Sequence, residues 1–149
     1  MATQANNVLK MLKEIAAKEV DLAAEALAQA MKAASEAQSK YELLLEYRQD
    51  YAKNLNKILE AGMGAEAYQN FQNFFKKLDQ AIAGQLDVVE MTKPQVTIQR
   101  QLWQESQRKK LSYEVLSQRS DKRELKVEQK KDQKMMDEFA MRISRTKHV

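Results

Sequence analysis

The chain has 149 residues, of which 31% are charged, and carries a formal net charge of +4. Three glycines and one proline are too few for the turns of a strand sandwich or an α/β fold, so the composition favours long helices. The absence of cysteine excludes disulfides, thiolate metal sites and cysteine nucleophiles. No apolar run approaches the roughly 18 residues of a membrane span, and MATQANNVLKMLKE lacks a signal-peptide core. We therefore expect a cytoplasmic protein.

Two helices are predicted, and glycines separate them. The first runs from about residue 7 to 61, with Thr3, Asn6 or Asn7 available as its N-cap. Gly62 and Gly64 in EAGMGAEA supply the one credible turn, over residues 62–64. The second helix runs from about 65 to 144. Pro94 lies inside it and predicts a kink, not a domain boundary, so residues 1–149 are expected to form a single domain.

Each predicted helix carries its own heptad seam, that is, an unbroken alternation of three-residue and four-residue steps. The first seam comprises Leu9, Lys13, Ala16, Val20, Ala23, Leu27, Ala30, Ala34, Ala37, Tyr41, Leu44, Arg48, Tyr51, Leu55 and Ile58. The second comprises Phe71, Phe75, Leu78, Ile82, Gln85, Val89, Thr92, Val96, Gln99 and Trp103.

Folding the chain at the glycines brings the two seams into register, with facing residue numbers that sum to 126. Small residues then meet large ones, because Ala37 faces Val89 and Ala23 faces Trp103. The expected fold is all-α: a long antiparallel two-helix coiled coil, or helical hairpin, with a C-terminal helical overhang after about residue 123. The alternative is a long parallel homodimer whose helix would have to pass through both glycines of the turn.

Catalytic chemistry has little support in the sequence. The one histidine, His148, is near the C-terminus, where a solvated side chain is the ordinary outcome. Phosphate-loop, nucleophile-elbow and zinc-protease motifs do not occur. Carboxylates on a two-helix rod project into water without a cleft that could shift their pKa values. We expect a non-enzyme with no catalytic residues, cofactor, metal or small-molecule substrate.

Charge is uneven along the chain. Residues 1–99 carry a net charge of −2, whereas residues 100–149 carry +6. The basic stretch 108–134 has interspersed acids, which is typical of a solvated helix. It could instead serve an acidic partner, such as nucleic acid, a membrane face or the lining of a protein pore. The interleaved glutamates argue against nucleic acid.

The overhang ends in an apolar strip within DQKMMDEFAMRIS. The strip has helical spacing and faces no intramolecular partner, and adaptable methionines suit docking onto another protein. A short fold-back or a self-contact is the alternative. The strip comprises Met135, Met136, Phe139 and Ile143.

Four segments together resemble the flagellar export protein FliJ family: AAKEVDLAAEAL, LLEYRQDYAKNLN, AYQNFQNFFKKLDQAI and DQKMMDEFA. The resemblance covers nearly the whole chain and implies a stalk-like coiled coil in type III export during flagellum biogenesis. In that family the end with both termini enters a hexameric export ATPase, and the other part contacts the cytoplasmic domain of the membrane export gate. The resemblance also implies escort of export chaperones and a location at the inner membrane.

The family's gate-binding positions fall on both sides of the turn. Four of them lie on the seams and three flank the seams, so the apolar stripe is wider than two helices can cover. The overhang strip would serve the ATPase. A free-standing adaptor or chaperone that clamps partner helices without an ATPase is the alternative function. The gate-binding positions implied by the resemblance are Leu44, Tyr47, Tyr51, Phe74, Leu78, Ala81 and Gln85.

Overall fold

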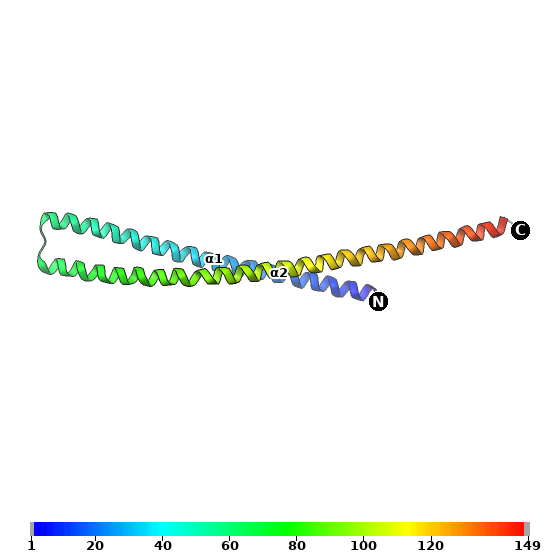
Figure 1. Cartoon of the computed structure of the whole chain (residues 1–149), viewed down its shortest axis with the longest axis horizontal. Coiled ribbons are helices and arrows are strands. Elements are labelled where there is room, and N and C mark those ends of the chain that lie inside the picture. The colour runs from blue at the N-terminus through cyan, green and yellow to red at the C-terminus, as the bar shows by residue number, and fades with distance from the viewer. Residues whose placement is uncertain (1, 148–149) are drawn as a thin grey trace. The chain divides into compact units, whose positions relative to one another are not determined.

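The computed structural model describes residues 2–147, which form two long helices (Figure 1). Helix α1 spans Ala2–Ala61 and helix α2 spans Ala65–Lys147. No strand occurs in the described range. The helices pack against each other in antiparallel directions, which confirms the predicted all-α helical hairpin. The one histidine, His148, lies outside the described residues.

The turn between the helices depends on the conformation of one glycine. Gly62 has a φ of +95°, a value that L residues with a Cβ rarely adopt. Its N–H donates to the carbonyl oxygen of Leu59 at 3.2 Å, and the N–H of Tyr68 donates to the Gly64 carbonyl at 3.1 Å. Gly62 therefore ends α1 in the manner of a left-handed C-terminal glycine, and Gly64 accepts the first hydrogen bond of α2.

Helix α1 begins earlier than the expected start at about residue 7, so Thr3, Asn6 and Asn7 lie within it. The side chain of Asn6 bonds to α2 and not to the backbone of its own helix. It donates to Glu124 and accepts from the Ser120 hydroxyl at 3.0 Å. A contact between helices has thus replaced the expected cap.

Helix α2 continues through Pro94 without a break. Pro94 has no N–H and cannot donate to the carbonyl of Glu90. Two threonine hydroxyls donate to other backbone carbonyls in the turn before Pro94. Thr92 donates to Val89 at 2.6 Å and Thr97 donates to Lys93 at 3.2 Å. The kink at this position stays a prediction.

The contacts divide the chain into two compact units. Residues 22–104 form the unit around the turn, here the turn unit, and residues 1–21 with 105–149 form the terminal unit. The most buried residues of the turn unit are one small and one medium-sized side chain, Ala37 at 5% and Val89 at 4% exposed. All ten predicted positions of the second seam are buried or half-buried. In the first seam only Arg48 and Ile58 are exposed.

The predicted register is confirmed in each unit by one direct contact. In the turn unit the rings of Tyr51 and Phe75 meet at 6.5 Å and 86°. In the terminal unit Asn6 bonds to Ser120. Both pairs satisfy the predicted sum of 126.

The seam of α2 continues into the terminal unit with polar side chains. Half-buried residues recur there at steps of three and four, and the apolar periodicity of the sequence did not reveal them. Ala16 on α1, 1% exposed, is the one buried residue described in this unit. Beyond Glu124 every described residue to Lys147 is exposed, which confirms the overhang. The continued seam comprises Ser106, Lys110, Tyr113, Ser117, Ser120 and Glu124.

Candidate protein-interaction surfaces

The seven residues expected to bind the export gate all lie in the turn unit, and we call them the turn face. The seam members are half-buried, whereas the flanking members reach solvent. Tyr47 is 53% exposed and Phe74 is 40% exposed, and Ala81 is exposed as well. The half-buried members are Leu44, Tyr51, Leu78 and Gln85.

Tyr51 joins the seam to the flank through aromatic contacts. Its ring centroid lies 4.5 Å from that of Phe74 with an interplanar angle of 31°, and 6.5 Å from those of Phe71 and Phe75. Contacts of this kind stabilise beyond area burial by about 0.5–1.5 kcal/mol each. Tyr51 therefore supports Phe74 from the seam, while part of the Phe74 side chain stays exposed to solvent.

The charged interruption of the seam, Arg48, has partners of its own. Its Nε donates to Asp79 Oδ1 at 2.6 Å, and its guanidinium lies 5.8 Å from the Phe75 ring centroid. The hydrogen bond that Arg48 donates to Asp79, and then the negative charge of Asp79, raise the pKa of Arg48 above its ordinary value. The seam alone did not predict this pair, because Asp79 lies one residue beyond Leu78, the seam position that Arg48 faces.

One member of the turn face is polar, and one exposed apolar residue lies beside that face. Gln85 donates its amide to the Ala37 carbonyl at 2.9 Å, so its side chain ties the helices together. Val88, which the sequence reasoning missed, is 45% exposed. The sequence could have predicted this position, because Phe74, Ala81 and Val88 follow one another at heptad spacing on the flank of the seam.

The predicted strip on the overhang is solvent-exposed along its whole length. Met135 and Met136 are each 68% exposed and Phe139 is 65% exposed, with Ile143 at 41%. The methionines and Phe139 line a shallow hollow of about 460 Å³ together with Arg142. Helix α2 stays helical here and does not fold back within the described residues. We call Met135, Met136, Phe139 and Ile143 the methionine strip.

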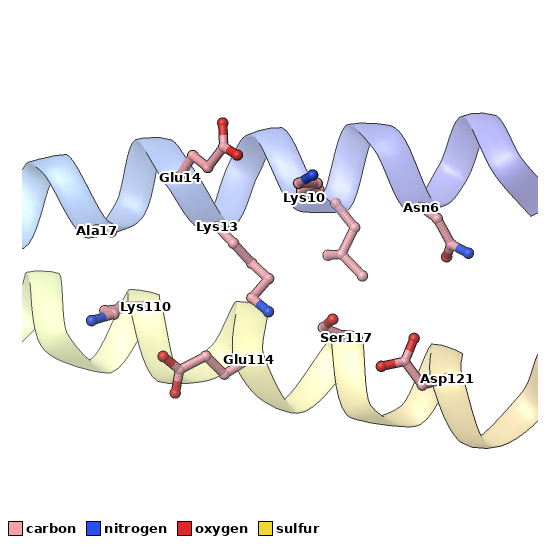
Figure 2. A pocket seen from close by; sticks show the side chains of 10 residues that line it. Asn6, Lys10, Lys13, Glu14, Ala17, Lys110, Glu114, Ser117 and Asp121 are labelled. Carbon is pink, nitrogen blue, oxygen red and sulfur yellow. The ribbon is translucent and has the colours of Figure 1, made fainter.

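One side of the terminal unit is lined by charges of both signs (Figure 2). Lys13 extends from α1 toward α2, on the side where Glu114 and Asp121 stand. Acidic and basic groups mix there around a hollow of about 550 Å³ with a partly apolar floor. We call this side the mixed-charge side. It resembles a solvated coiled-coil edge more than a binding pocket.

The described residues 2–147 contain no group of three or more acidic or histidine side chains that could hold a metal ion. No helix within that range is long and apolar enough to cross a membrane. The fold and its surfaces define a class: a helical coiled-coil protein with exposed apolar faces.

Comparison with known proteins specifies the class further. The sequence profile of the family described as "Flagellar FliJ protein" matches residues 6–148. The chain is 30% identical over 142 residues to the flagellar FliJ protein of Escherichia coli (strain K12), covering 95% of this chain and 97% of that protein. It is 31% identical over 143 residues to the flagellar FliJ protein of Salmonella typhi, with the same coverages. The chain belongs to the flagellar FliJ protein family and is a flagellar export component.

Proposed function

We propose that the chain is a non-enzymatic stalk of the flagellar export apparatus, formed by one helical-hairpin domain. It links the hexameric export ATPase to the cytoplasmic domain of the membrane export gate, and it escorts export chaperones. Its place is cytoplasmic and peripheral to the inner membrane at the flagellar base. The mechanism is mechanical linkage, so no step of chemistry takes place on this chain.

The observation that carries the proposal is the presence of two separate apolar surfaces in different units. A linker must bind two partners at once, and one surface cannot hold both. The turn face lies in residues 22–104, and the methionine strip lies in the terminal unit. Each is larger than the scattered single apolar residues of an ordinary protein surface.

In this proposal the turn face binds the gate. Tyr47 and Phe74 supply contact area, because exposed aromatic side chains next to a rigid support are typical of interface hot spots. Tyr51 supports Phe74 from the seam through their ring contact, and Leu44 and Leu78 add apolar area beside it. Gln85 acts through the backbone of α1, to which it is bonded.

The methionine strip and the overhang bind the ATPase. An unpaired helix with flexible thioether side chains can adapt to a lining of protein, and helix-in-groove recognition uses anchors at this spacing. Basic side chains along residues 122–134 add attraction to an acidic lining.

Removal of residues 124–149 separates the linker from an adaptor that works without an ATPase. The truncated chain keeps the turn unit and should bind the gate domain as the full chain does, while it fails to promote assembly of the ATPase hexamer. Assembly is measured by light scattering of the purified ATPase. A matched control is the full chain with Gln129→Ala, an exposed overhang position outside the strip. Undiminished hexamer assembly with the truncated chain would refute the linker.

A further inference from the structure

The terminal unit has a second side, opposite its mixed-charge side, and one ion pair defines it. Lys109 on α2 donates to Glu19 on α1 at 3.3 Å. Leu12 precedes Glu19 by one heptad, and Leu116 follows Lys109 by one heptad. The helices are antiparallel, so one heptad back along α1 and one heptad forward along α2 lead to the same level of the hairpin. Leu12 therefore faces Leu116, just as Glu19 faces Lys109.

This second side has an apolar floor. Val8 and Ile15 lie four residues before and three residues after Leu12, on the same face of α1. Val8 is 57% exposed and Ile15 is 47% exposed, while Leu12 is half-buried. Leu116 on α2 is 48% exposed and lines a shallow hollow of about 540 Å³ that is formed by residues of α2 alone. Val8, Leu12, Ile15 and Leu116 are here called the aliphatic groove.

The rim of the aliphatic groove on α2 is basic. Arg119 and Arg123 follow Leu116 by three and seven residues and therefore lie on its face. Arg119 lines the same hollow as Leu116, with Arg108 and no acid. Arg123 lines another hollow, which it shares with Ala5 of α1 and with Glu124 and Glu128. Neither arginine forms an ion pair among residues 2–147.

Two acids of this stretch of α2 lie on the other side, and Glu124 and Glu128 line the same hollow as Arg123. Glu114 and Asp121 stand on the mixed-charge side, where Lys13 of α1 extends toward Glu114 (Figure 2). Glu124 accepts the hydrogen bond of Asn6. The two sides of the terminal unit therefore differ. Acids and bases are mixed on one side, whereas on the other side Arg119 and Arg123, which form no ion pair among residues 2–147, border an apolar floor beyond the Lys109–Glu19 pair.

We infer that the aliphatic groove is a docking site for one amphipathic α-helix of a protein partner, with acidic residues along the edge that meets α2. Aliphatic side chains at steps of three and four match the spacing of a third helix laid between two. The arginines without an ion pair favour negative charge on the occupant, because charge complementarity fixes its orientation. The arginines stand on one edge only and the floor has no aromatic residue, which favours a helix over a membrane surface.

The test uses the full chain and a labelled synthetic peptide of about four heptads, with leucine at the two seam positions and glutamate at the flanking ones. A second peptide has lysine in place of each glutamate. Binding is measured by fluorescence anisotropy. The glutamate peptide is expected to bind at least about tenfold more tightly than the lysine peptide, and its affinity should fall as salt rises.

Two variants locate the binding. Ile15→Glu should weaken the glutamate peptide about tenfold or more. The double variant Arg119→Glu/Arg123→Glu should weaken it similarly and improve binding of the lysine peptide, a reversal that unfolding could not produce. Lys10→Glu on the mixed-charge side and Leu125→Glu on the overhang are matched controls, expected within about twofold of the unchanged chain.

Equal binding of both peptides, or a preference that survives the double variant, would overturn the inference. Failure of the glutamate peptide to bind, together with binding to vesicles of anionic phospholipid, would assign the groove to a membrane. Concentration-dependent dimers that Ile15→Glu abolishes would assign it to a second copy of the chain. None of these outcomes depends on the ATPase or the gate, so the docking site and the proposed linkage fail separately.

Discussion

Replacement of Tyr47 by alanine separates a binding residue from a core residue, because Tyr51 provides the comparison one helical turn away. Tyr47 is 53% exposed, and its ring contacts no other ring among residues 2–147. Tyr51 is half-buried and contacts three phenylalanine rings. The two substitutions remove the same atoms from different environments.

The structure sets the magnitudes. Truncation of a fully buried aromatic side chain costs about 3–5 kcal/mol, so half-buried Tyr51 should cost about 2–3 kcal/mol of unfolding free energy. Tyr47→Ala loses less buried area and gains about 0.5 kcal/mol of helix propensity, which leaves a net loss below about 1 kcal/mol. If Tyr47 is an interface hot spot, its removal should weaken gate binding at least about tenfold.

Urea denaturation followed by circular dichroism gives the stability of each variant. Titration of the purified gate domain by calorimetry gives its affinity. The expected pattern is a stable Tyr47→Ala chain that binds the gate poorly, beside a Tyr51→Ala chain that is clearly less stable. Equal stability losses for the two variants would show that Tyr47 is part of the core. An unchanged affinity of Tyr47→Ala would remove it from the gate-binding face.

Three substitutions test the hairpin itself, each by urea denaturation. Gly62→Ala forces a Cβ into a φ of +95° and should cost about 1–2 kcal/mol, whereas Gly84→Ala, inside α2 with open space around the new methyl group, should stabilise by about 1 kcal/mol. The same sign for both would contradict the assigned turn. Ala37→Leu overfills the contact with Val89 and should cost about 1–3 kcal/mol, and a neutral result would mean that the axes are not closely packed there.

The sequence predicted most of the fold because heptad periodicity and the glycine turn are independent signals that agree. Apolar seam positions fixed the register over the turn unit, as the contact between Tyr51 and Phe75 confirms. The start of α1 was missed because Asn6 has a good capping side chain, and the sequence does not show that Glu124 and Ser120 occupy it. The N-cap preference of asparagine was overridden by a contact with residues more than a hundred positions away in the chain.

The polar seam of the terminal unit was missed for a related reason. A search for apolar repeats stops where serine, lysine and glutamate take the seam positions, although the register continues unchanged through Ser120. Among the candidate site residues, the exposure of Tyr47 and Phe74 follows from their place beside the seam. The bond from Gln85 to the Ala37 carbonyl does not, because it requires the close approach of two backbones.

The linkage can be tested in one retention measurement. The gate domain is immobilised, and the purified ATPase is passed over it with or without this chain. Linkage by the chain predicts that the ATPase is retained when the full chain is present, and released by either Tyr47→Ala or removal of residues 124–149. Retention of the ATPase without the chain, or equal retention with the truncated chain, would contradict linkage through this hairpin.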